Sequence, residues 1–340
     1  MRKFSALILL FSILFLASCG GDRLNVDVSE IKTDQVKIKR LENDLFALDT
    51  NKIEALSPAL QKKYGSFFEK YLTDVLNNGG IADSTYGAGL RRFLGDRDMN
   101  EEYKRINEVF TEPDQVALEN ELTEAFRHIK YYFPDTVLPV QVLTMMSGFN
   151  GFGIVNIDST LAICMDRYLG QDAVQYDMIR VEAYRRRIMD KKYILADIVT
   201  AWVMSKFDKN VPDKNLLEVM IKAGKIMYCA KAIIPETQDS LIIGYSQQQI
   251  TYCEKWEKDL WAHFSQKDKL FTNDLKEIVS YTTDGPFCSA ISKDCPPAIA
   301  KYIGYRIVCS YMKNNSKVTL QDLMSENDAQ KILTKAKYKP

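Results

Sequence analysis

Few residues of this chain have the types and spacing that support chemistry, and the first of them is Cys19. It follows a short basic region and an apolar run from Ala6 to Leu16, which is too short to span a bilayer but has the length of a signal-peptide core. The residues Leu16–Gly20 (LASCG) resemble the bacterial lipobox, in which small residues precede a cysteine that becomes lipidated. We therefore predict a signal peptide over residues 1–18 and a mature chain that is anchored to a membrane through Cys19.

Six further cysteines belong to the predicted mature chain. Four of them lie in apolar, periodic stretches, where a small buried hydrophobe is the default interpretation: Cys164, Cys229, Cys253 and Cys309. Cys288 and Cys295 lie seven residues apart in a loop-like segment, so both a small disulfide loop and two free thiols remain open. No pair has C-x-x-C spacing, which argues against a zinc knuckle or a thioredoxin-type centre.

The segment that begins Asp96-Arg97-Asp98 resembles the start of a calcium-binding loop. An EF-hand needs glycine at position six and a bidentate glutamate at position twelve, but these positions hold Glu101 and Asn107. We therefore expect a solvated helix start here and no calcium site.

The remaining candidates for chemistry are two histidines and one basic cluster. His128 and His263 each lie in an aromatic-rich helical stretch without a sequence partner, so we interpret them as structural residues. The cluster over residues 185–187 is three arginines, which we expect on a solvated helix face or beside carboxylates. The mature chain contains no G-x-S-x-G, P-loop or G-x-G-x-x-G pattern, and we predict no catalytic, cofactor-binding or metal-binding residues.

Charge balance argues against one class of partner. The chain has 45 basic and 45 acidic residues. A protein that neutralises phosphates usually has a basic excess or a basic stripe, so we expect no nucleic-acid partner.

The elements that must position these residues are mostly helices. After a polar tether over residues 19–35, a short strand is expected over 36–41, and the pattern is helical from Glu42 to Phe133. Two apolar segments, 138–146 and 153–164, flank an Asn-Gly turn signal and predict a β-hairpin. Further helices are expected over 194–207, 216–232, 246–264 and 298–311, with two shorter ones beyond Val318. We expect one helix-rich globular domain of the α+β class over residues 36–340, with a small sheet.

Several ordered segments of the chain resemble the gliding-motility-associated lipoprotein GldB family. They are the lipobox, LADIVTAWVMSKF at 195–207, LLEVMIKAGKIMY at 216–228, IIGY at 242–245 followed by Gln249, IGYRIV at 303–308, and the final KYKP. That family in turn resembles predicted zinc proteases of the zincin type, in which a hairpin lies beside a helix with the H-E-x-x-H motif. The resemblance therefore implies a zincin-like fold.

The metal ligands of that fold are missing from this sequence. On the zincin pattern, Asp197 and Ala201 occupy the two histidine positions, and Ile198 occupies the position of the catalytic glutamate. The third ligand of those proteases directly precedes a glycine, and here Ala223 precedes Gly224. A catalytic zinc needs three protein ligands and an open position. We therefore expect a degenerate zincin-like domain that is not an enzyme.

The function that the resemblance implies is that of an envelope-anchored, non-enzymatic lipoprotein that assists or scaffolds a gliding-motility and secretion machine. Two alternatives remain open, namely a hydrolase with a different active site and a lipid-anchored protein that binds a ligand or peptide. We expect partners in the cell envelope and no cofactor. Only one acid, Asp22, follows Cys19 closely, and Arg23 offsets it, so we expect the protein to face the periplasm.

Overall fold

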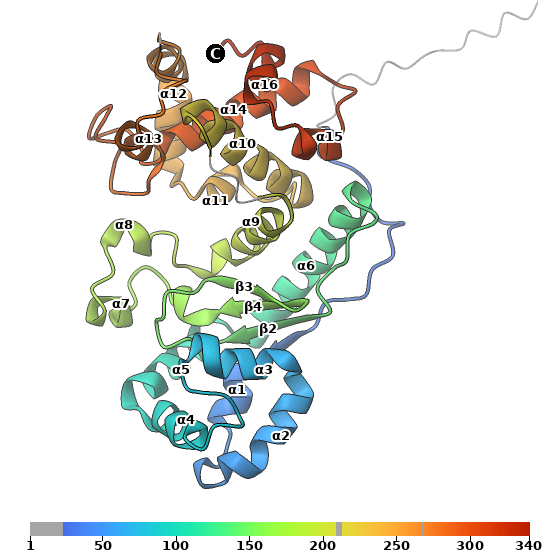
Figure 1. Cartoon of the computed structure of the whole chain (residues 1–340), viewed down its shortest axis with the longest axis vertical. Helices are drawn as coiled ribbons and strands as arrows, with labels where there is room; N and C mark the ends of the chain where they lie inside the picture. Colours follow the sequence, from blue (N-terminus) through green and yellow to red (C-terminus); the bar gives the residue numbers. More distant parts are fainter. Residues whose placement is uncertain (1–22, 209–212, 267) are drawn as a thin grey trace, which may run out of the picture.

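A computed structural model describes residues 23–208, 213–266 and 268–340. The predicted signal peptide and Cys19 lie outside the described residues. The molecule is elongated, and a small sheet at mid-height separates a lower group of helices from a larger upper group (Figure 1). The prediction of a predominantly helical fold with a small sheet is confirmed.

The sheet has four strands in the order β1-β2-β4-β3. Their bounds are β1 (Ile38–Arg40), β2 (Gln141–Met145), β3 (Ile154–Ile157) and β4 (Thr160–Cys164). β1, β2 and β4 run parallel, and β3 pairs antiparallel with β4 at one edge. The residues that follow the three parallel strands therefore meet at one edge of the sheet.

The predicted hairpin exists, but with different partners. It joins β3 to β4 through Asp158 and Ser159, which both have positive φ angles, whereas β2 lies parallel to β4. The Asn150-Gly151 signal lies in the loop between β2 and β3 and is not the hairpin turn. The prediction failed because the segment 153–164 contains two strands, β3 and β4, and because the burial of β2 and β4 does not indicate their relative direction.

The sheet separates two hydrophobic cores because its side chains alternate between its faces. Val142, Leu161 and Ile163 point into the larger upper core, whereas Leu143 and Ala162 point into the lower core. The lower core is enclosed by the short helices α1 (Leu41–Phe46), α2 (Ile53–Tyr64), α3 (Ser66–Lys70) and α4 (Tyr86–Gly95), the 3₁₀ helix η1 (Thr50–Lys52) and the π-helical turn η2 (Tyr71–Val75).

The other face of the sheet is covered by long helices (Figure 1). α5 (Arg97–Val109) leads into α6 (Glu112–Tyr132), which packs with α9 (Ile194–Phe207) and α10 (Leu216–Ile233). Short elements connect β4 to α9: η3 (Met165–Arg167), α7 (Val174–Met178), α8 (Ala183–Arg186) and η4 (Lys191–Tyr193). The chain ends with α11 (Asp239–Ile243), α12 (Gln247–Phe264), α13 (Leu275–Thr282), α14 (Ile299–Asn314), α15 (Leu320–Ser325) and α16 (Ala329–Ala336). Most bounds from α9 onward differ from the predicted ones by three residues or fewer.

The upper group is built on close contact between α10 and α14. A Cβ atom on Gly224 would lie 2.3 Å from the carbonyl oxygen of Gly304, and one on Gly304 would lie 1.9 Å from that of Met220. Two glycines therefore let the helix backbones touch.

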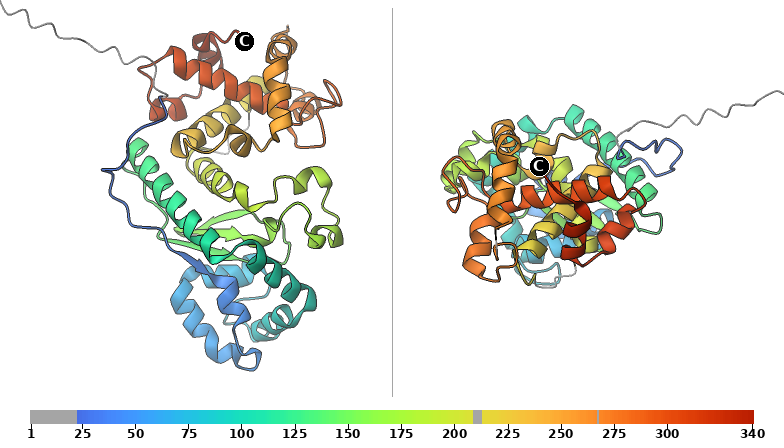
Figure 2. Two further views of the ribbon diagram at one scale, coloured as in Figure 1. Left: turned by 180° about the vertical axis from the view of Figure 1, so that it is seen from behind. Right: turned by 90° about the horizontal axis from the view of Figure 1, so that it is seen from above.

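The segment predicted as a polar tether packs against the body over residues 23–35. Leu24 and Val28 are buried, and the Arg23 guanidinium donates a hydrogen bond of 2.8 Å to the carbonyl oxygen of Met312. The segment follows the flank of the molecule from α14 to β1 (Figure 2). The expectation that it spaces the body from the membrane is wrong for these residues, because its apolar side chains find sites on the body. No helix among the described residues is long and apolar enough to span a bilayer.

Candidate functional site

The three α9 residues that the sequence comparison placed on the zincin motif are Asp197, Ile198 and Ala201. The carboxylate of Asp197 accepts a hydrogen bond of 2.8 Å from the Tyr168 hydroxyl, and its Oδ2 lies 3.8 Å from Nε of Arg167. Burial raises the pKa of Asp197, against the hydrogen bond from Tyr168 and the charge of Arg167. Ile198 is buried in the upper core, and Ala201 is half-buried.

Packing accounts for the glycine that follows Ala223. Gly224 is the point at which α10 contacts Gly304 of α14, so its small size serves helix packing. Ala223 itself is half-buried and brings no polar group. No group of three or more histidine, cysteine or acidic side chains suited to a metal ion occurs in the described ranges.

A buried polar cluster lies instead at the carboxyl ends of the parallel strands. Asp166, which follows β4, accepts hydrogen bonds from the Ser147 hydroxyl (2.6 Å), from the backbone N–H of Phe149 (2.8 Å) and from the Cys164 thiol (2.7 Å). Ser147 follows β2, so Asp166 ties the ends of two parallel strands to the loop between them. Phe149 has φ of +60°, which is a strained conformation for a bulky residue and is held by this bond.

Glu102 of α5 adds an unusual group beside this cluster. Its side chain is fully buried, and neither carboxyl oxygen has a hydrogen-bond partner in the part of the chain that the structure describes. Burial, together with the charge of Asp166, raises the pKa of Glu102 to about 10. Glu102 is therefore an uncharged acid at neutral pH.

The end of β1 contributes a buried ion pair to the same edge. Glu42 is fully buried and pairs with Arg40, and the single Thr144 hydroxyl donor lies within hydrogen-bonding distance of both of its carboxylate oxygens (2.9 and 2.8 Å). Arg40 also donates a bond of 3.2 Å to the Asn107 side chain. These contacts join β1, β2 and α5.

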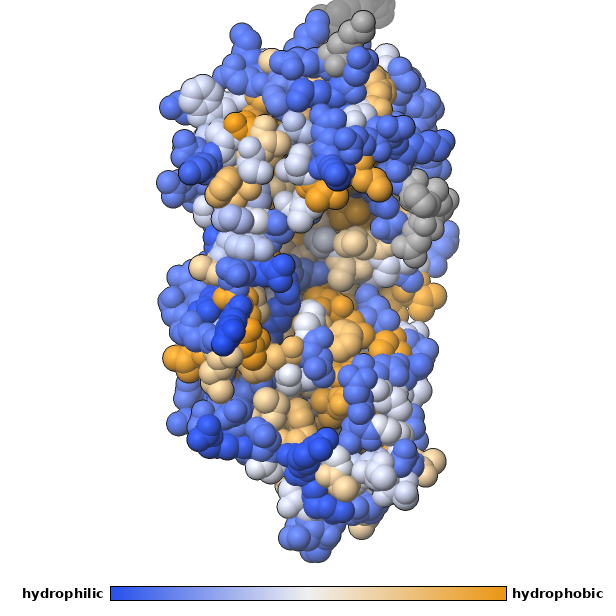
Figure 3. All heavy atoms as spheres, turned by 60° about the vertical axis from the view of Figure 1, so that its left-hand side comes forward, coloured by the Kyte–Doolittle hydropathy of each residue, from blue (hydrophilic) through white to orange (hydrophobic). Residues whose placement is uncertain are grey.

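A cavity of about 440 Å³ opens beside Asp166 and Arg167. Its other walls come from the loop after β2 and from the α7 and α8 region, and most of them are apolar. The face that is on the left in Figure 1 is hollowed at mid-height, where apolar side chains come to the surface (Figure 3). The Asp166 carboxylate is already fully occupied by its donors, so this cavity offers little free chemistry.

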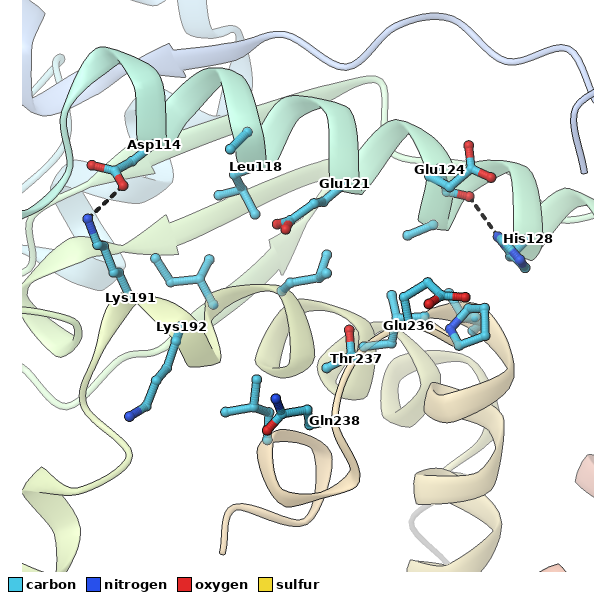
Figure 4. A pocket seen from close by; sticks show the side chains of 18 of the residues that line it. Asp114, Leu118, Glu121, Glu124, His128, Lys191, Lys192, Glu236, Thr237 and Gln238 are labelled. Carbon is cyan, nitrogen blue, oxygen red and sulfur yellow. Dashed lines mark hydrogen bonds and ion pairs between the residues drawn. The ribbon is translucent and has the colours of Figure 1, made fainter. Parts of the chain in front are cut away.

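A groove of about 720 Å³ lies between α6, the start of α9 and the turn from α10 to α11. We call it the α6 groove. Its apolar floor includes Leu118 and Ile194, and charged side chains of both signs lie along its rim (Figure 4). Lys191 and Asp114 form an ion pair of 2.6 Å across one end. The groove is large enough for a peptide side-chain cluster or a small ligand.

Four titratable side chains of α6 line this groove: Asp114, Glu121, Glu124 and His128. His128 is buried, and its Nδ1 lies 3.1 Å from the backbone oxygen of Glu124 (Figure 4). Its Nε2 has no hydrogen-bond partner within the described ranges. Loss of hydration against the groove wall raises the pKa of Glu121. The wall of the groove therefore contains a buried polar atom, Nε2 of His128, without a hydrogen-bond partner among the described residues.

The comparisons with known proteins give one match. The family model described as "Gliding motility protein GldB" matches residues 21–340. The chain belongs to the GldB family. No curated protein and no solved structure matches it. Membership places this GldB chain among proteins of gliding motility, and the α6 groove and the strand-end cluster both lie inside the matched range.

Other predicted residues of this GldB chain have structural roles. Asp96 caps α5 by accepting from the N–H groups of Asp98 and Met99, as expected for a helix start. Nε2 of His263 on α12 lies 2.9 Å from the Tyr281 hydroxyl. His128 lies on α6, so the two histidines have different neighbours. In the arginine cluster, Arg186 pairs with a carboxylate, that of Asp177, at 2.6 Å.

The cysteines outside the lipobox are all free thiols. Cys288 and Cys295 are nonetheless neighbours, because the N–H of Cys288 donates to the backbone oxygen of Cys295 at 2.8 Å. A hydrogen bond between their side chains lowers the pKa of Cys288 to about 7. Cys164 was predicted as an apolar filler, but its thiol is a donor to Asp166.

No pattern in the sequence predicted the buried Glu102, the Asp166 cluster or the α6 groove. Their residues come from segments far apart, and no spacing rule connects them. One signal was available: Glu102 interrupts the apolar face of α5, since it precedes Ile106 by four residues.

Proposed function

We propose that this member of the GldB family is a lipid-anchored, non-enzymatic protein of the cell envelope that assists or scaffolds the gliding-motility machine and a linked secretion apparatus. Family membership supports the gliding-motility part. The observation that carries the non-enzymatic part is the set of side chains on α9. Asp197 is bonded to Tyr168, and Ile198 is a core residue at the position where a zinc protease needs its general base.

The fold still has features that agree with a degenerate zincin-like scaffold. The antiparallel edge strand β3 contacts α9, so a hairpin lies beside the helix that would carry the motif. We propose that the functional feature of this scaffold is the α6 groove and not a metal centre. We infer that the protein acts by binding a polypeptide segment of an envelope partner in the α6 groove.

The non-enzymatic part is tested by metal content and activity together. We expect purified protein to contain no stoichiometric zinc and to cleave no casein-like substrate. Asp197→Ala should change neither result. About one zinc per chain that is lost together with activity in Asp197→Ala would refute this part.

The groove is tested by a substitution that fills it without touching the core. Ala117 is exposed on α6 and lines the groove, whereas its neighbour Val116 is exposed and does not line it. We expect Ala117→Arg to abolish complementation of a deletion strain in a motility assay and Val116→Arg to preserve it, with equal protein levels. Equal motility of the two variants would remove the groove from the proposal.

We further propose that the body faces the periplasm. The segment after Cys19 has a single acid, Asp22, followed at once by Arg23. Protease treatment of intact cells should leave the protein whole, and treatment of lysed cells should digest it. Loss of the protein from intact cells would indicate surface exposure.

A further inference from the structure

Five lysines gather at the end of the molecule where the described chain begins. They are all exposed, and none has an ion-pair partner among the described residues: Lys313, Lys317, Lys335, Lys337 and Lys339. We call this set the C-terminal lysine patch. The mature chain has slightly more acids than bases after the signal peptide is removed, so the patch is a local excess of positive charge.

Hydrogen bonds hold the parts of the patch together. The side chains of Asn314 and Asn315 donate to the backbone oxygens of Ala336 (2.6 Å) and Lys335 (3.1 Å), which joins the end of α14 to the end of α16. Arg23 donates to the backbone oxygens of Met312 and Val318, next to Lys313 and Lys317. The start of the described chain is therefore fixed at the patch, and the C-terminus lies at the same end of the molecule (Figures 1 and 2).

Neighbouring acids do not neutralise the patch. Glu326 forms an ion pair with Lys331, and Asp322 accepts from the Thr319 hydroxyl at 2.7 Å. Lysines in the last turn of a helix commonly offset its dipole, and this accounts for Lys313 and Lys335. It does not account for Lys317 and Lys339, which lie outside the helices.

The length of chain between the anchor and the body identifies what this surface faces. Three residues separate Cys19 from Arg23, and the four residue steps between them reach at most about 14 Å even when fully extended. Arg23 is bonded to the body, so a lipidated Cys19 brings the patch close to the lipid headgroups. Basic side chains near an anionic leaflet gain attraction that decays over a Debye length of about 8–10 Å.

We propose that the C-terminal lysine patch binds the anionic phospholipid headgroups of the membrane that holds the lipid anchor. The patch makes a second attachment and sets the orientation of the body. The α14–α16 end then rests on the lipid surface, α2 and α4 point away from it, and the α6 groove opens sideways between the two ends. The inference rests on the anchoring at Cys19 in the proposed function, but the binding itself does not require the acyl chains.

Co-sedimentation with vesicles tests the proposal on a mature, unlipidated chain that starts at Gly20, which retains every contact described here. We expect binding to vesicles of phosphatidylcholine with about 30% phosphatidylglycerol, little binding to pure phosphatidylcholine, and loss of binding as salt is raised. The triple variant Lys313→Gln/Lys317→Gln/Lys335→Gln should weaken partitioning about 100-fold, since each surface lysine contributes about five-fold.

A matched control removes the same charge from the opposite end. Lys62, Arg92 and Lys104 are exposed and without ion-pair partners in the described structure, and they lie on α2, α4 and α5. Lys62→Gln/Arg92→Gln/Lys104→Gln should bind anionic vesicles within about two-fold of the unchanged protein. Equal weakening by both triple variants, or no preference for anionic vesicles, would overturn the proposal. Neither result would affect the lipid anchoring, which is read separately from the membrane association of Cys19→Ala in cells.

Discussion

The upper helices of this protein are held together by close apolar packing. The buried polar cluster at the carboxyl ends of the parallel strands is held together by hydrogen bonds and an ion pair. In the upper group, α10 and α14 pack backbone against backbone through Gly224 and Gly304, among apolar side chains. At the sheet edge, buried polar groups from β1, α5, β2 and β4 bond one another. The first region should be most sensitive to added side-chain size at the helix contact. The second should tolerate modest changes in size and not the loss of a partner.

The largest effect is expected at the helix contact. Gly224→Ala places a Cβ atom 2.3 Å from a backbone oxygen, so α10 and α14 must separate. We expect a loss of about 4 kcal/mol or more in the free energy of unfolding, or failure to fold, measured by urea denaturation. Gly95→Ala is the control, because no atom lies within 4 Å of its added Cβ, and it should change stability by less than about 1 kcal/mol. Similar values for the two variants would contradict the contact.

The next effect is expected at the buried ion pair. Arg40→Met leaves the Glu42 carboxylate buried with Thr144 as its remaining donor, and this should cost about 3 kcal/mol in the free energy of unfolding. Arg40→Met/Glu42→Gln should recover a large part of the loss, because no unpaired charge is then buried. A double variant as unstable as the single one would show that Arg40 acts through packing on Phe110, which its guanidinium contacts at 5.2 Å.

Glu102 gives a smaller effect with a characteristic pH dependence. Its pKa is raised from 4.5 to about 10, so between these values the unfolded chain releases a proton that the folded chain keeps. The contribution of Glu102 to stability is therefore greatest below pH 4.5 and falls as pH rises toward 10. Glu102→Met should remove this decline and stabilise the protein at pH 6.5, relative to pH 5, by about 2 kcal/mol. A gain that does not change with pH would contradict a protonated Glu102.

The smallest effect is expected at Asp197. Asp197→Asn keeps the shape and an acceptor for the Tyr168 hydroxyl, so the free energy of unfolding should fall by no more than about 1 kcal/mol. Metal content and motility should stay unchanged. A motility defect at normal protein level would give the carboxylate a functional role that its contacts with Tyr168 and Arg167 do not suggest.

The sequence predicted the helices that local patterns define, but not the contacts between segments that lie far apart in the chain. Apolar residues within short windows define α9, α10 and α12, and the bounds of these helices were predicted almost without error. The direction of β2 depends on β1, more than 100 residues earlier, and no local pattern contains that information. The polar segment at 23–35 was interpreted as a tether because its few apolar residues have no period, yet Leu24 and Val28 are buried.

The candidate site shows the same limit. The hypothesis of a degenerate motif could be made from the sequence because Asp197, Ile198 and Ala201 lie within one helical turn and a half. The α6 groove was not, because its walls come from α6, α9 and the turn after α10, and a cavity is a property of how these elements pack. Residue spacing predicts which side chains share one face of a helix, but it does not predict which other elements pack against that face.

We propose that this protein works by binding a partner in the α6 groove. Photo-cross-linking in living cells can detect that partner at the groove. A photoreactive amino acid at position 117, inside the groove, should give a discrete cross-linked product with an envelope protein, and the same probe at the exposed position 116, outside it, should not. The product should disappear when Leu195, which also lines the groove, is changed to Gln. Absence of a product at 117 in motile cells, or the same product from both positions, would contradict the claim.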